Sequence, residues 1–144
     1  MNTYLVTGGA GFIGSAVVRQ LIQETLSRVV NVDCLTYAGN LESLGESHKH
    51  SRHVFCKADI RDASALYQAF QTARPRGVLH LAAESHVDRS IDTPADCIST
   101  NLVGTSVLLQ EALRYWRGLA TEAQSAFRFI HVSTDEVFGS LGVE

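Results

Sequence analysis

The sequence predicts an α/β fold built on a doubly wound parallel sheet. Short apolar runs rich in β-forming residues alternate with helical segments in the order β-α-β-β-α-β-α-β. The runs barely alternate between apolar and polar residues, as expected for strands that are covered on both faces. Polar and glycine-rich motifs follow the carboxyl ends of these runs, where doubly wound sheets bind their ligands. A length of 144 residues suits one domain over residues 1–144, with the sheet ending after its fifth strand.

Each element follows from a local pattern. Strands are predicted at Thr3–Thr7, Arg28–Asp33, Val54–Lys57, Gly77–Leu81 and Phe127–Ser133. Helices are predicted at Phe12–Thr25, Ala63–Ala73 and Ala95–Trp116. Pro75 closes the second helix, and residues 39–53 form mostly loop with one short helix around Leu41–Leu44.

The third predicted helix is apolar on more than one face. One stripe holds Ile98, Leu102, Leu109 and Trp116, and Val103, Val107 and Leu113 widen it. Because a surface helix normally buries one stripe, we expect this helix to pack on the sheet and on a partner subunit. Gly104 would allow close approach of that partner, so the chain is expected to form a homodimer through Ala95–Trp116.

Composition excludes several classes of protein. With 12 Lys+Arg against 15 Asp+Glu, the net charge of −3 argues against nucleic-acid binding and anionic membranes. No apolar run reaches the roughly 18 residues of a membrane span, and no export signal is visible. Cys34, Cys56 and Cys97 lie far apart and are odd in number, which favours a reducing cytoplasm. The cluster of His48, His50, His53 and Cys56 is interpreted as a solvated loop, so no metal site is expected.

The segment from Thr7 to Gly14 carries the strongest functional signal. It follows a strand, opens a helix and reads G-x-G-x-x-G from Gly9. Glycines let the backbone turn tightly and approach a pyrophosphate, and the helix N-terminus attracts the anion. Asp33 ends the next strand, 19 residues after Gly14, where a carboxylate binds ribose hydroxyls and repels a 2′-phosphate. These features predict a Rossmann-type domain that binds NAD; a plain glycine-rich turn beside a surface acid is the disfavoured alternative.

Two later strand ends fit the same ligand. Asp59-Ile60 follows the third strand, where a carboxylate could meet the adenine amino group, although an exposed acid there is also common. Leu81 to Ser85 follow the fourth strand and include two alanines, which would let the backbone pass close to the cofactor. Tight packing between strand and helix explains those small residues equally well.

Together, TGGAGFIGS, VDCLTYAGNLESL, ADIRD, HLAAESHVDRSI and STDEVFG resemble the extended short-chain dehydrogenase/reductases. Within that family the chain is most similar to the sugar-nucleotide 4,6-dehydratases that act on dTDP-glucose. The resemblance implies the following cofactor contacts: Gly8, Gly11, Phe12, Ile13 and Gly14 at the pyrophosphate; Asp33, Cys34, Leu35 and Thr36 at the ribose; Asp59 and Ile60 at the adenine; Leu81, Ala82, Ala83, Glu84 and Ser85 at the nicotinamide; and Thr100. It implies Ser85, His86, Asp88 and Thr134 as contacts of the nucleotide sugar.

The same resemblance implies a lyase reaction with Thr134, Asp135 and Glu136 as catalytic residues. Asp135 would protonate the departing C6 hydroxyl and Glu136 would remove the C5 proton, between oxidation at C4 and return of the hydride to C6. Two neighbouring carboxyl groups in a desolvated pocket separate their pKa values, as an acid and a base require. From the residues alone, Ser133, Thr134 and Asp135 could equally cap whatever follows the strand.

The chain departs from the family in two main respects. The Tyr-x-x-x-Lys pair is absent, because none of the four tyrosines is followed by lysine four residues later. Family members are about twice this length, so we expect an N-terminal portion without the substrate-binding domain, which binds NAD weakly and does not turn over alone. The alternatives are a UDP-glucose dehydratase, a sugar-nucleotide epimerase, which would lack Glu136, or a non-catalytic NAD-binding module.

Overall fold

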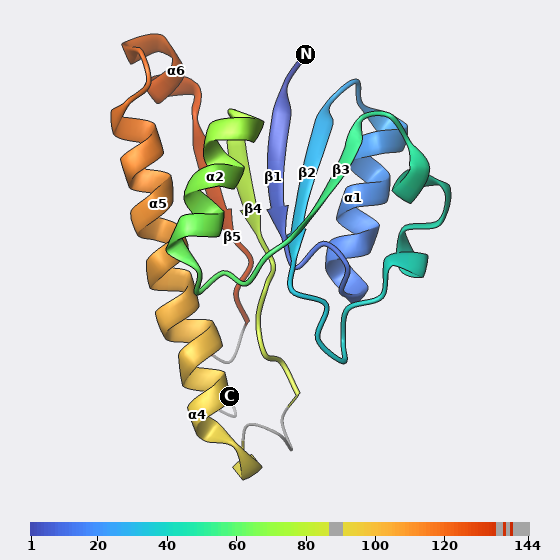
Figure 1. Cartoon of the computed structure of the whole chain (residues 1–144), viewed down its shortest axis with the longest axis vertical. Helices are drawn as coiled ribbons and strands as arrows, with labels where there is room; N and C mark the ends of the chain where they lie inside the picture. Colours follow the sequence, from blue (N-terminus) through green and yellow to red (C-terminus); the bar gives the residue numbers. More distant parts are fainter. Residues whose placement is uncertain (87–90, 135–136, 138, 140–144) are drawn as a thin grey trace, which may run out of the picture.

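The computed structural model describes residues 1–86, 91–134, 137 and 139. Five parallel strands form one sheet in the order β3-β2-β1-β4-β5 (Figure 1). Their bounds are β1 Thr3–Thr7, β2 Arg28–Asp33, β3 His53–Lys57, β4 Gly77–His80 and β5 Arg128–His131. The chain winds outward from β1 in both directions, which confirms the predicted doubly wound fold.

The helices are α1 Phe12–Glu24, η1 Leu41–Lys49, α2 Ala63–Ala73, α4 Pro94–Cys97, η2 Ile98–Gly104, α5 Thr105–Arg117 and α6 Thr121–Ala126. The predicted long helix is therefore present but has a π-helical segment, η2, between α4 and α5. The region expected to be mostly loop holds a 3-10 helix, η1, which is kinked at Gly45. α6 was not predicted. Among the residues described, no helix is long and apolar enough to cross a membrane.

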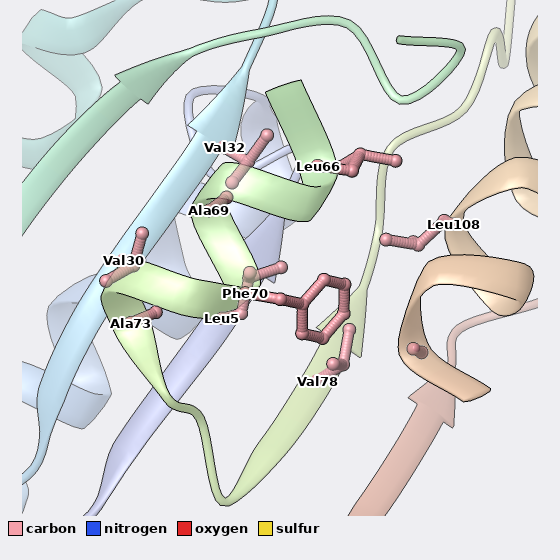
Figure 2. Close-up of a cluster of buried hydrophobic side chains, with 10 residues drawn as sticks. Leu5, Val30, Val32, Leu66, Ala69, Phe70, Ala73, Val78 and Leu108 are labelled. Atoms are coloured by element: carbon pink, nitrogen blue, oxygen red, sulfur yellow. The ribbon is translucent and has the colours of Figure 1, made fainter. Parts of the chain in front are cut away.

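The sheet buries apolar side chains on both faces. Leu5 and Val6 are neighbours on β1, are both fully buried, and belong to different clusters. Leu5 packs beneath α2 and α5, as Figure 2 shows, whereas Val6 packs with α1 and η1. The first cluster contains Leu5, Val30, Val32, Leu66, Ala69, Phe70, Ala73, Val78, Leu108 and Ala112. Burial of consecutive residues explains why the strand sequences barely alternate.

The carboxyl end of α1 is held by an arginine from another part of the chain. The Arg52 guanidinium donates hydrogen bonds of 2.6–2.8 Å to the carbonyl oxygens of Ile22, Thr25 and Ser27. α1 has no basic residue in its own last turn, so Arg52 supplies the positive charge and donors that this helix end lacks. The contact holds α1 against the sheet and thereby positions its other end, at Phe12.

The long helix faces the sheet with a side different from the predicted stripe. Leu108 and Ala112 are the buried residues of α5, whereas Ile98, Leu102, Leu109, Leu113 and Trp116 are 36–68% exposed. Gly104 also differs from its expected role: a Cβ there would lie 2.7 Å from the Ile60 side chain of the same chain. The glycine thus permits an intramolecular contact, and the apolar stripe lies on the outer surface.

Candidate functional site

The loops that follow β1, β2 and β4 meet at the carboxyl edge of the sheet. The Gly8 N–H donates to the Val32 carbonyl oxygen of β2 at 2.9 Å. On the other side, a Cβ on Gly8 would lie 2.6–2.7 Å from backbone atoms of Leu81 and Ala82. Gly8 has a positive φ of +71°, so both its backbone shape and its surroundings require glycine.

The start of α1 is shaped to leave its backbone amides accessible. A Cβ on Gly14 would lie 2.0 Å from the Gly8 carbonyl oxygen, so the helix and loop touch through backbone alone. In the described chain, no side chain caps this helix at Gly11, and its first turn holds no acid. Phe12 and Ile13 are 93% and 60% exposed although they are apolar. An uncapped helix N-terminus beside a glycine turn is a suitable site for a phosphate group.

Asp33 joins this glycine loop to the loop after β2. One carboxylate oxygen accepts a hydrogen bond from the Ala10 N–H at 2.9 Å, and the other accepts from the Leu35 N–H at 2.8 Å. The Ala10 carbonyl in turn accepts from the Asn40 N–H at 2.9 Å. Each carboxylate oxygen retains a lone pair, so Asp33 can still accept a hydrogen bond from a ligand hydroxyl.

Asp59 follows β3 and brings a second carboxylate, besides Asp33, to the same edge of the sheet, where Cys34 follows β2. Burial raises the pKa of the Cys34 thiol, and the negative charges of Asp59 and Asp33 raise it further. Cys34 is therefore a protonated thiol near both carboxylates and not a nucleophile. In the same loop, the Thr36 backbone carbonyl oxygen accepts a hydrogen bond from the Gly39 N–H at 3.0 Å and closes the turn.

Asp59 has an arginine partner that sequence reasoning missed. The Arg61 side chain donates to both Asp59 carboxylate oxygens, at 2.9 and 2.6 Å, and also to the Ser99 hydroxyl at 3.0 Å. The hydrogen bond from Arg61 lowers the pKa of Asp59, so this group is an oriented, ionised acceptor. Ile60 is only 5% exposed because its side chain packs on Gly104, which leaves its backbone for any ligand contact.

The loop after β4 is held by the π-helical segment. The Asn101 side chain accepts from the Glu84 N–H at 2.8 Å and donates to the Glu84 carbonyl at 2.9 Å. Beside this clamp is a pocket of about 230 Å³ lined by Arg61, Glu84, His86, Thr93, Asp96, Cys97 and Thr100. The structure therefore brings together three of the predicted site residues, Glu84, His86 and Thr100. Ala83 and Ser85 are exposed on the same loop.

His80 is a buried core residue with a hydrogen-bond partner at each ring nitrogen. Its Nδ1 lies 2.7 Å from the Thr7 hydroxyl and its Nε2 lies 3.0 Å from the Thr105 hydroxyl. The Thr7 hydroxyl also accepts from the Ala82 N–H at 3.4 Å, so the network reaches the site loop. Burial, and secondly the charge of His131, lower the pKa of His80 to about 4.

Three of the predicted site residues, Asp88, Asp135 and Glu136, lie outside the described residues. Thr134 is exposed just beyond β5. Since β5 pairs with β4, with His131 opposite His80, the loops that carry Thr134 and Ser85 leave adjacent strands. Across the described ranges no group of three His, Cys, Asp or Glu side chains is placed to hold a metal ion.

Sequence reasoning also missed Tyr37 and Asn101. The Tyr37 hydroxyl donates to a Glu84 carboxylate oxygen at 3.0 Å, a contact between residues too distant in sequence to pair by pattern. Asn101 had a detectable signal, because asparagine is disfavoured within a helix unless its side chain has a specific partner.

The strand order, the glycine turn after β1 and the acid at the end of β2 define a Rossmann-type α/β domain. A family model for GDP-mannose 4,6 dehydratase matches residues 5–144. The chain belongs to this family.

Curated and solved relatives agree with that assignment. The dTDP-glucose 4,6-dehydratase of Escherichia coli is 59% identical over 95% of this chain and 38% of its own length. The solved dTDP-glucose 4,6-dehydratase of Streptomyces venezuelae, with NAD and dTDP bound, superposes with a TM-score of 0.85 at 41% identity, over 99% of this chain and 42% of that one. The UDP-glucose 4-epimerase of Thermotoga maritima, solved with UDP-glucose, superposes with a TM-score of 0.76 at 37% identity. The match covers 92% of this chain and 38% of the epimerase. The resemblance expected from the motifs is confirmed, and the chain spans about two fifths of the length of these relatives.

Proposed function

We propose that this chain binds NAD and forms the N-terminal part of a sugar-nucleotide 4,6-dehydratase that converts dTDP-glucose to dTDP-4-keto-6-deoxyglucose. The observation that carries the proposal is the glycine turn: a Cβ at Gly8 or Gly14 would fill it with contacts of 2.0–2.9 Å to backbone. The turn lies between the uncapped α1 and the ordered carboxylate of Asp33. Support comes from relatives that were solved with NAD bound.

In this proposal each loop takes one part of the dinucleotide. The amides at Phe12 and Ile13 bind the pyrophosphate, and Asp33 accepts from the adenosine ribose while disfavouring a 2′-phosphate. Asp59, held by Arg61, accepts from the adenine amino group. The loop from Leu81 to Ser85 and Thr100 contact the rest of the cofactor.

NAD supplies a hydride acceptor and donor for the sugar. The chain's own residues bind, orient and exchange protons. Ser85 and Thr134, on loops from adjacent strands, hold the sugar hydroxyls, with His86 and Asp88 nearby. Asp135 donates a proton to the C6 hydroxyl and Glu136 removes the proton at C5, roles that rest on the resemblance.

We infer that this stretch of chain does not complete the reaction alone, because it has no Tyr-x-x-x-Lys pair to remove the C4 hydroxyl proton. A non-catalytic NAD-binding module is the second candidate function, and it is supported by the same lack of a Tyr-x-x-x-Lys pair in this sequence. The cysteines at positions 34, 56 and 97 are free thiols in the structure, in keeping with the cytoplasmic location we propose.

Changing Asp33 to asparagine tests the cofactor assignment. We expect wild-type protein to bind NAD in preference to NADP, and Asp33→Asn to bind NAD about tenfold more weakly with that preference lost, because an amide nitrogen cannot accept a hydrogen bond. Titration calorimetry with each dinucleotide measures both effects. Glu46→Gln, which removes an exposed carboxylate from η1, is the control and should bind like wild type. Wild-type protein that takes up neither dinucleotide contradicts the proposal.

We further propose that the Ala95–Trp116 helix forms a homodimer interface. Its outer face carries a groove lined by Asn101, Leu102, Thr105, Ser106, Leu109, Gln110 and Leu113. Leu109→Asp should weaken self-association at least tenfold in analytical ultracentrifugation, since it places a charge among apolar side chains. Leu26→Asp, at an 84% exposed leucine outside this helix, is the control. Equal dissociation constants for both variants and wild type would rule out this face.

A further inference from the structure

Two of the loops at the carboxyl edge touch at their outer parts. The Tyr37 hydroxyl, after β2, donates a 3.0 Å hydrogen bond to the Glu84 carboxylate, after β4. The Tyr37 ring also meets the His86 ring edge to face, with centroids 6.4 Å apart. The link therefore combines a polar contact with an aromatic one.

The strand order determines what this link crosses. β2 and β4 are the two neighbours of β1, one on each side. A bond between the loops that follow them must span the carboxyl end of β1, where the glycine turn begins (Figure 1). A ligand that lies on the glycine turn thus lies beneath the link.

Both ends of the link are anchored, whereas its middle is exposed. Glu84 is held through its backbone N–H and carbonyl by Asn101. Two hydrogen bonds hold the loop that carries Tyr37. Before Tyr37, the Leu35 N–H donates to the Asp33 carboxylate, and after it the Asn40 N–H donates to the Ala10 carbonyl oxygen. Tyr37 itself is 52% exposed. The side-chain contact can therefore open while the loops keep their places.

We propose that Tyr37 and Glu84 form a strap over the glycine turn that slows release of the bound dinucleotide. The inference rests on the proposed function and deepens it. A reaction that takes a hydride from the sugar and returns it to the same sugar needs the cofactor to stay bound through the whole cycle. Tyr37 acts as a positioning residue, since it holds Glu84 across the site.

The test compares release and capture of NADH by stopped-flow fluorescence. Tyr37→Phe, which keeps the ring and removes the donor, and Glu84→Ala, which removes the acceptor, should each raise the dissociation rate about three- to tenfold with less than a twofold change in the association rate, as loss of one exposed hydrogen bond predicts. The double variant should match the larger single effect, because both changes remove the same bond. Tyr67→Phe on α2, where the ring lies under the Arg114 guanidinium of α5, is the matched control and should release NADH like wild type.

Any other outcome overturns either the strap alone or the proposed function together with the strap. Unchanged release in Tyr37→Phe, additive effects in the double variant, or an association rate that rises as much as the dissociation rate overturns the strap. A general loss of structure would also lower the midpoint of thermal unfolding without ligand, which the strap predicts to be unchanged. Wild-type protein that takes up no dinucleotide overturns the proposed function and the strap with it.

Discussion

Gly14→Ala should destabilise the protein by about 3 kcal/mol or more and abolish dinucleotide uptake. The new Cβ would lie 2.0 Å from the Gly8 carbonyl oxygen and 2.9 Å from the Gly9 Cα, so it meets backbone that no rotamer change can move aside. This overlap can be relieved only if α1 moves away from the glycine turn. That movement would increase the separation of the backbone amides proposed to bind the phosphates. Urea unfolding gives the loss of stability, and titration calorimetry gives the loss of binding.

Gly118→Ala is the matched control for that substitution. Gly118 ends α5 with a φ of −85°, and a Cβ there would come no closer than 3.4 Å to any neighbour outside the adjacent residues. Its unfolding free energy should stay within about 0.5 kcal/mol of wild type. If both variants lose stability equally, backbone contact at Gly14 is not the cause.

The second large effect is a loss of stability in mild acid that comes from one histidine. The pKa of His80 is lowered from 6.5 to about 4, so protons bind the unfolded chain more tightly than the folded one. The contribution of His80 is complete above about pH 6.5 and falls as the pH drops toward 4. By this linkage, protonation of His80 should lower the unfolding free energy by about 2 kcal/mol between pH 7 and pH 5.

Urea unfolding at several pH values, compared between variants, isolates this contribution. His80→Gln should be less stable at pH 7, since its bonds to Thr7 and Thr105 are disturbed, but should lose about 2 kcal/mol less on acidification. His131→Gln should keep most of the wild-type slope, because repulsion from His131 is the smaller cause of the lowered pKa. Parallel wild-type and His80→Gln curves would show that another group titrates.

The strands and two helices could be predicted because buried elements need apolar residues in consecutive runs or at helical spacing, and these patterns are visible in the sequence. β1, β2 and α2 have the predicted bounds, and α1 ends one residue earlier than predicted. The π-helical segment was missed because its apolar spacing differs little from that of an α-helix. α6 was missed because six residues are too few to show periodicity; Trp116 and Gln124 hold it through reciprocal side-chain bonds to backbone.

The site could be predicted where backbone shape demands a residue type. Gly8, Gly14 and Asp33 meet at the expected edge, since tight turns and strand ends have sequence signatures. Pairs of side chains from separate elements have no such signature, which is why Arg61–Ser99 and Tyr37–Glu84 were not anticipated. Ile60 was expected at the ligand, and its burial on Gly104 depends on how the long helix lies over the loop.

The π-helical segment limits how the long helix can change in length. A π turn holds one residue more than an α turn, and each residue of an α-helix advances by about 100°. Removing one residue between Cys97 and Thr105 would replace the π turn with regular α-helix and change the direction of the side chains within it, Asn101 among them. Its amide would then point away from Glu84. A deletion in this helix therefore has to be matched by a rebuilt loop after β4, so the two segments are expected to vary together among homologous chains.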